Sequence, residues 1–175
     1  LGHLSNANFT NATVSGVTFA GAKLKGADLS GADFSDAILE GVVQPELANC
    51  PASLPPNWHC VDTFLFGNEV NYSGVDFSNH LFNFDSEANG EFITLSAANF
   101  ENASNAEFRL VAGGSFAASG LNAKNATNLK FKATDQIIGS DFSSADFSGS
   151  SNCKVYSTGG ADPDFTNGVY PNNFS

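Results

Sequence analysis

A period of five residues runs through the first 41 positions of the chain and constrains its fold more than any other feature. The position two residues before each large apolar residue holds Gly, Ala or Val, and the two positions after it hold polar or small residues. Five fits neither the 3.6-residue period of a helix nor the two-residue period of a plain strand. The large apolar residues of this pattern are Leu4, Phe9, Val14, Phe19, Leu24, Leu29, Phe34 and Leu39.

A chain that turns a corner after every pentad explains this period. One small and one large residue per side would point inward and fill the interior of a narrow square coil. Four such sides close one coil, which predicts that Leu4 stacks under Leu24 and Phe9 under Leu29. Successive coils should rise by about 4.8 Å, the spacing of neighbouring strands. We therefore predict an all-β fold, a quadrilateral β-helix with apolar ladders inside.

The segment Ala27-Asp28-Leu29-Ser30-Gly31-Ala32-Asp33-Phe34-Ser35 resembles the unit of the pentapeptide-repeat family, loosely A-D/N-L-x-x. Eight consecutive matches occur over residues 1–41, and further pentads lie within 70–82 and 140–149. The resemblance implies a right-handed quadrilateral β-helix.

The length of the chain predicts one β-helix domain over residues 1–175. Between the clear pentads, Phe residues recur every eight positions, which predicts longer sides or bulged corners with the Phe side chains still inward. These residues are Phe84, Phe92, Phe100, Phe108 and Phe116. We expect four parts: regular coils over 1–41, an inserted Pro- and Cys-containing loop over 42–67, less regular coils over 68–158, and a cap or tail over 159–175.

The inserted loop contains two cysteines, Cys50 and Cys60, in the segment CPASLPPNWHC. Prolines cannot donate to a β-ladder, so this loop should leave the coil. A disulfide would hold such a loop and would imply an oxidising compartment. Free thiols, or a metal site that includes His59, are the alternatives, although this spacing matches no common zinc pattern. Cys153 is left over and is expected to be a small buried residue.

The same loop resembles an inserted module of secreted bacterial pentapeptide-repeat proteins, roughly LPxxW…YLxGPxAxLxG. Here Leu54-Pro55-Pro56-Asn57-Trp58 is followed by Phe64-Leu65-Phe66-Gly67. The resemblance implies a secreted, periplasmic or lumenal protein. The chain contains no Met, so we expect a processed mature form or a fragment. No apolar run reaches about 18 residues, which predicts no membrane span.

The charge is strongly negative and unevenly distributed. The formal net charge is −11, and no Lys or Arg occurs between Lys25 and Arg109. Ten Asp or Glu residues lie from Glu40 to Glu107. This stretch should repel nucleic-acid backbones, so we expect no direct nucleic-acid binding. An acidic surface serves solubility or recognises a basic partner.

The sequence gives only weak indications of a metal-binding or catalytic site. Asp85, Glu87 and Asn89 precede Gly90 in a pattern similar to a calcium loop, but the twelfth position is Ser96, which lacks a bidentate carboxylate. An Asn-Gly turn between strands is the alternative. The Ser and Asp residues follow the repeat, and a coil filled by side chains has no natural deep pocket. We therefore predict no catalytic residue, no metal and no cofactor. The histidines, likewise outside any metal-binding spacing, are His3, His59 and His80.

These observations favour a non-catalytic structural or binding module outside the cytoplasm, with an unknown protein or glycan partner. An alternative, implied by the family, is a DNA mimic that binds a DNA-handling enzyme such as gyrase. The negative charge fits that alternative, whereas the C-terminal dimerisation helix of such proteins is missing. Exposed coil ends would allow two copies to stack as a homodimer. The predicted partner surface is Trp58, Glu69, Asp76, Asp85, Glu87 and Glu91.

Overall fold

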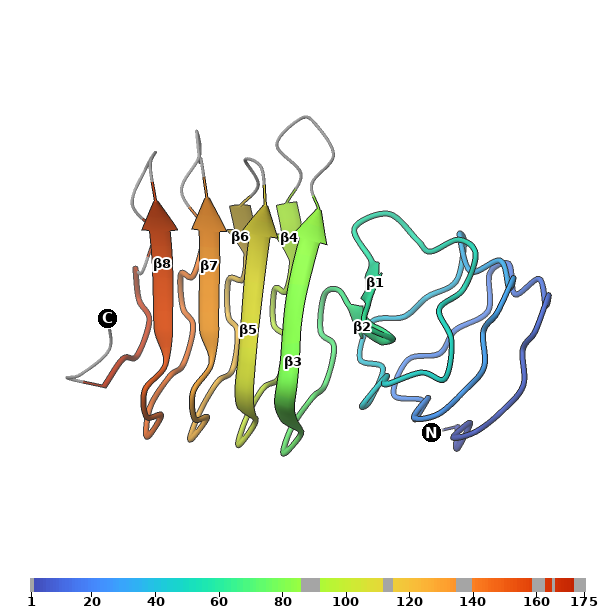
Figure 1. Ribbon diagram of the computed structural model, residues 1–175, viewed down its shortest axis with the longest axis horizontal. Helices are drawn as coiled ribbons and strands as arrows, with labels where there is room; N and C mark the ends of the chain where they lie inside the picture. Colours follow the sequence, from blue (N-terminus) through green and yellow to red (C-terminus); the bar gives the residue numbers. More distant parts are fainter. Residues whose placement is uncertain are drawn as a thin grey trace.

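The fold is a β-helix whose coils follow one another along a single axis, from the first residues at one end to the last at the other (Figure 1). It was obtained as a computed structural model that describes residues 2–85, 92–111, 115–134, 140–158, 163–164 and 166–171. Over these ranges the chain contains strands, bridges and turns but no helix, and so no helix that could cross a membrane.

The first coils repeat after every fourth pentad, as the sequence predicts. Parallel bridges connect residues of one coil to residues of the next, and each coil contains four turns. This register places the large apolar residue of each pentad directly over its counterpart in the coil below. The bridges with this constant step include His3 to Lys23, Asn8 to Asp28, Thr13 to Asp33 and Thr18 to Ile38.

The polar residues of each pentad close its corner. The side chain of Asn8 accepts a hydrogen bond from the backbone N–H of Thr10 at 2.8 Å, and Asp28 does the same for Ser30 at 3.0 Å. In seven of the eight pentads up to Gly41 the last residue is Gly or Asn with a positive φ, which these two residues adopt most readily. The Asp and Asn residues of the repeat therefore serve the backbone. The same hydrogen bond is made by Asp33, Asn71, Asn99, Asn122, Asp141, Asp146 and Asp164.

The inserted loop contains an antiparallel hairpin of strands β1 (His59–Val61) and β2 (Phe64–Phe66). Its two turn residues, Asp62 and Thr63, both have positive φ, as in the tightest hairpin turns. All three residues of β2 are buried. The hairpin lies between the regular coils and the strands that follow (Figure 1).

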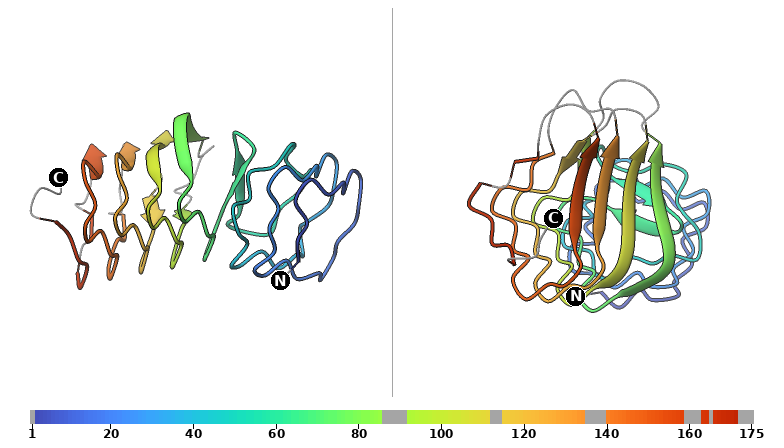
Figure 2. Two further views of the ribbon diagram at one scale, coloured as in Figure 1. Left: turned by 90° about the horizontal axis from the view of Figure 1, so that it is seen from below. Right: turned by 60° about the vertical axis from the view of Figure 1, so that its left-hand side comes forward.

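The coils after the hairpin are longer and unequal in length. Asn71 pairs with Asn99, Asn99 with Asn122, and Asn122 with Asp146. Strands β3 (Asp76–Asp85), β5 (Ser104–Val111), β7 (Lys130–Thr134) and β8 (Lys154–Thr158) form one parallel sheet. Strands β4 (Phe92–Thr94) and β6 (Ser115–Ala117) form a second, on another side of the coil (Figure 2). Among the described residues, the long strands β3 and β5 therefore lengthen one side of the coil, which is one of the two alternatives that the sequence left open.

Stacked aromatic rings fill the interior of these longer coils. Phe84, Phe100, Phe108 and Phe116 are all at most 3% exposed, as expected for inward Phe residues at the eight-residue spacing. The side chain of Phe92 lies outside the described residues. In the first coil Leu4 and Phe9 are partly buried and pack against this core.

The C-terminal segment continues the coil. Asp164 pairs with Asp141 and Val169 with Asp146, in parallel register. The ring of Tyr170 stacks on Phe147 with a centroid distance of 5.6 Å. The described part of 159–175 is thus a further partial coil that covers the end of the core.

Candidate binding surface

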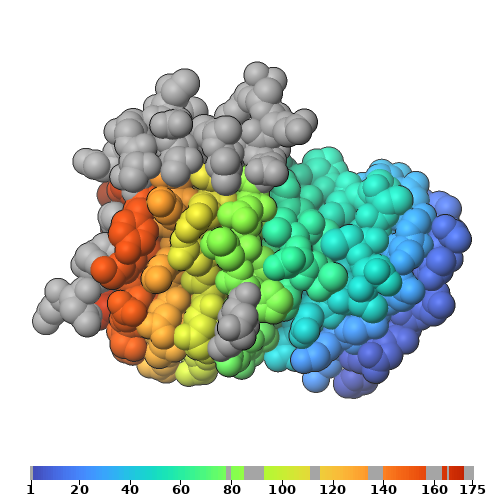
Figure 3. All heavy atoms as spheres, in the orientation of Figure 1, coloured from blue at the N-terminus to red at the C-terminus, as the bar shows by residue number. Residues whose placement is uncertain are grey.

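The outer side of the four-stranded sheet presents side chains in two straight rows. Successive residues of a strand point to opposite faces, so the partners of the inward Phe residues point to solvent. We call the eight outward residues the sheet face, and it is turned toward the viewer in Figures 1 and 3. One row is Leu81, Glu107, Lys130 and Lys154, and the other is Asn83, Arg109, Lys132 and Tyr156.

The sheet face gathers positive charge on an acidic protein. Four of the seven Lys and Arg residues of the chain lie on it, next to one carboxylate, that of Glu107. The eight residues thus carry a formal charge of +3, whereas the whole chain carries −11. Such a local reversal of sign attracts anionic groups to this side of the molecule.

Glu107 organises the cations around it. Its carboxylate is 2.6 Å from Nη2 of Arg109 and 3.9 Å from Nζ of Lys130. These partly exposed ion pairs contribute little stability. Among the described residues, no carboxylate lies within ion-pair distance of Lys132 or Lys154. Nζ of Lys154 instead lies 5.9 Å from the ring centroid of Tyr156.

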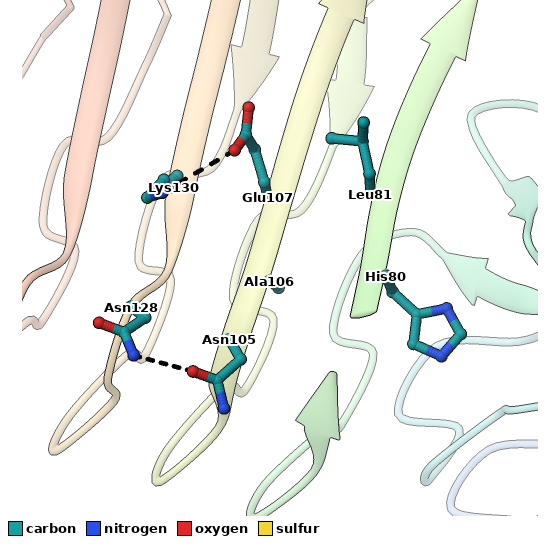
Figure 4. Close-up of a pocket in the computed structure, with 7 residues that line it drawn as sticks. All are labelled: His80, Leu81, Asn105, Ala106, Glu107, Asn128 and Lys130. Atoms are coloured by element: carbon teal, nitrogen blue, oxygen red, sulfur yellow. Dashed lines mark hydrogen bonds and ion pairs between the residues drawn. The ribbon is translucent and has the colours of Figure 1, made fainter. Parts of the chain in front are cut away.

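An open groove of about 480 Å³ runs across β3, β5 and β7 at one edge of this face (Figure 4). In it Glu107 and Lys130 lean toward one another, and Asn128 donates a hydrogen bond to Asn105 at 2.8 Å. The ring of His80 points away from Glu107, and its Nδ1 lies 3.5 Å from the carboxylate of Asp62 in the hairpin turn. The groove therefore offers amide, carboxylate and ammonium groups on a shallow floor.

The prediction that Trp58 belongs to a partner surface is wrong. Its side chain is 7% exposed and belongs to the core cluster. The indole lies against Gly67, where a Cβ atom would collide with the ring. A large aromatic group next to the buried strand β2 gains more from covering the core than from facing water.

The predicted acidic surface is only partly within the described residues. Glu69 and Asp76 are exposed, and Asp76 accepts hydrogen bonds from the hydroxyl of Ser104 at 3.0 Å and the amide of Asn105 at 2.9 Å. The side chain of Asp85 lies outside the described residues, as do Glu87 and Glu91. The same holds for the calcium candidates Asp85, Glu87 and Asn89.

The structure joins Cys50 and Cys60 in a disulfide. The third cysteine, Cys153, is 2% exposed, and burial raises the pKa of its thiol. Among the described residues no group of three His, Cys, Asp or Glu side chains could hold a metal ion.

Sequence reasoning missed the sheet face because its cations are scattered along the chain. The available signal was strict alternation, in Glu107-Phe108-Arg109 and Lys130-Phe131-Lys132, of charged and aromatic residues. Alternation of this kind indicates strands with one buried side. Only the coil register, however, shows that the outward residues of different strands lie beside each other.

The comparisons with known proteins agree with the coil geometry. The model of the family "Pentapeptide repeats" matches residues 3–41 in eight copies. A search of curated proteins found no match to the chain. Pentapeptide-repeat proteins are in general structural or binding modules without catalytic activity. With its regular four-pentad register and corner-closing Asp and Asn side chains, the segment 3–41 is similar to the pentapeptide-repeat family.

Proposed function

We propose that this protein is a non-catalytic binding module that acts outside the cytoplasm, built as a right-handed quadrilateral β-helix. The sheet face carries this proposal, because it holds eight side chains from four strands in two rows over a packed core. Stacked Phe rings fill the coil beneath it. A partner would therefore dock on the outer surface rather than enter the coil.

A position outside the cytoplasm is supported by the disulfide between Cys50 and Cys60, since such bonds persist in oxidising compartments. The likeness of the inserted loop to a module of secreted proteins supports the same location. Protein and glycan partners are the two classes that meet a binding module there.

The DNA-mimic alternative has less support. A duplex mimic presents a continuous negative surface, and the positive sheet face interrupts it. A gyrase supercoiling assay tests the alternative directly, because inhibition or protection of the enzyme by micromolar protein would favour the mimic.

The binding proposal is tested on arrays of glycans and of extracellular proteins. The variant L81S/Y156A removes two exposed apolar side chains from the sheet face, which are 41% and 39% exposed. The matched control V17S/I38S removes two from the regular coils, which are 44% and 48% exposed. We expect wild type and control to bind the same array spots and the sheet-face variant to lose them. Equal binding by all three proteins would contradict the proposal.

A further inference from the structure

We propose that the partner of the sheet face is an acidic polysaccharide, held by Lys130, Lys132 and Lys154 through its carboxylate or sulfate groups. This inference rests on the proposed function and names the class of partner. It follows from three features of the face: the sign of its charge, the spacing of its cations, and the neutral groups that lie among them.

The charge selects an anionic partner. The face carries +3 while the rest of the molecule is strongly negative, so an anion gains from this side and is repelled elsewhere. Lys132 and Lys154 have no carboxylate partner among the described residues. An external anion that binds these two ammonium groups would therefore break no ion pair among the described residues.

The spacing suits a linear polymer with one charge per short unit. Lys130 lies opposite Lys154 on the neighbouring parallel strand, at a strand spacing of about 4.8 Å. Lys130 and Lys132 lie two residues apart on β7, a distance of about 6.6 Å along the strand. Acidic sugars in a chain repeat their charged groups at comparably short intervals, so one chain could contact several lysines together.

The neutral groups on the face suit sugars. Tyr156 is 39% exposed and offers a ring on which the C–H face of a sugar can lie. The side-chain amide of Asn83 supplies a donor and an acceptor for hydroxyl groups. The carboxylate of Glu107 can accept hydrogen bonds from sugar hydroxyls, which a polysaccharide brings together with its anions and which a DNA strand lacks apart from its ends. The mixture therefore favours an acidic glycan over a nucleic acid.

The test measures binding of the whole protein to polygalacturonate fragments, to dextran sulfate and to single-stranded DNA by isothermal titration, with neutral dextran alongside. The variant K130Q/K132Q/K154Q removes three charges from the sheet face. The control K23Q/K25Q/K124Q removes three exposed lysines that lie elsewhere. We expect wild type and control to bind at least one acidic polymer and not neutral dextran. The sheet-face variant should bind roughly tenfold or more weakly, because it lacks three charge-assisted contacts.

Three results would overturn the inference. They are failure of wild type to bind either acidic polymer, equal weakening in both triple variants, and tighter binding of single-stranded DNA through the same lysines. Array binding that L81S/Y156A abolishes, without binding to acidic polymers, would overturn the glycan inference and leave the proposed function intact. Circular dichroism checks that the variants are folded, and single substitutions at Lys132 and Lys154 replace the triple variant if it is not.

Discussion

Phe108 and Phe131 stack face to face in the core, with ring centroids 4.9 Å apart and planes 9° from parallel. They are register partners on β5 and β7, and Phe82 of β3 continues the stack at 5.3 Å. The residues on either side of each Phe point outward, so the aromatic ladder also sets the positions of the cations on the sheet face. Packing inside the coil and the order of charges outside it are two results of one register.

The first prediction concerns this ladder. Phe131→Ala removes a fully buried ring that stacks on Phe108 and contacts Phe116 and Phe142. We expect the free energy of unfolding to fall by about 3–5 kcal/mol, because the neighbours cannot close the cavity. Urea denaturation measures the change. Leu81→Ala, on the outer side of the sheet, should cost well under half of that, and equal losses would contradict the assigned register.

The second prediction concerns a ladder of amides at one corner. Asn128 donates to Asn105 at 2.8 Å and accepts from Asn152 at 2.7 Å, and its φ is 56°. Asn128→Ala loses both hydrogen bonds. It also places at a positive φ a residue that has a Cβ atom but no polar side chain to stabilise the left-handed conformation. Asn128→Gly loses the hydrogen bonds but tolerates the φ. The Ala variant should therefore be less stable than the Gly variant by about 1 kcal/mol in thermal or urea unfolding. The reverse order would show that residue 128 does not have a left-handed backbone conformation.

The third prediction separates backbone strain from collision. Gly120 and Gly149 have nearly the same φ, 69° and 67°. A Cβ at Gly149 would collide with the side chain of Asn125 in the coil below, whereas a Cβ at Gly120 meets nothing within 4 Å. Gly149→Ala should thus lower the thermal unfolding midpoint more than Gly120→Ala. Equal shifts would mean that these coils are not stacked as described.

The fourth prediction is a pH dependence. The hydrogen bond from the Ser30 hydroxyl is the main cause that lowers the pKa of Asp28, and the one from the Ser53 hydroxyl lowers the pKa of Asp33. Both folded pKa values lie below the unfolded value of about 3.9. Ionised Asp28 and Asp33 therefore stabilise the fold above that pH, and this contribution is lost as the pH falls through the folded pKa values.

Asn can accept the same backbone hydrogen bond without titrating, as Asn8 does in its own pentad. The variant D28N/D33N should accordingly lose less unfolding free energy than wild type between about pH 5 and pH 3. Urea unfolding across that range measures the slopes. Parallel curves for the two proteins would contradict the prediction.

The fifth prediction concerns the cysteines. Under denaturing conditions without reductant, intact mass should show one alkylated thiol, that of Cys153, and three after reduction. The free energy of unfolding of the variant C50S/C60S should be about 2–4 kcal/mol lower than that of wild type, because the unfolded chain gains conformational entropy without the cross-link. Three alkylated thiols without reductant would show that the disulfide is absent, and the main support for an extracytoplasmic location would then be lost.

How much could be predicted varies along the chain with the strictness of the repeat. Over residues 3–41 a single period determines which residues point inward, so the stacking of Asn8 on Asp28 follows from sequence alone. After the hairpin the coils differ in length, and no fixed step predicts that Phe82 stacks on Phe108 rather than on Phe100. Local alternation of apolar and polar residues predicts which side chains point inward. The stacking partner of each side chain depends on the lengths of all the sides of the coil between the two residues.

The candidate site was harder to predict for the same reason. Trp58 was predicted as part of a partner surface, but its indole packs against Gly67 next to the buried strand β2. Lys130 and Lys154 lie on different coils, and only the register makes them neighbours. A surface built from four coils has no contiguous motif that sequence reading could find.

The most direct test of a binding surface on the sheet face is amide hydrogen exchange of the protein with and without a partner found on the arrays. Docking on the sheet face should slow exchange in peptides that cover β5, β7 and β8 and leave exchange unchanged in peptides from residues 2–41. Protection confined to residues 2–41, or no protection at these strands at saturating partner, would contradict it.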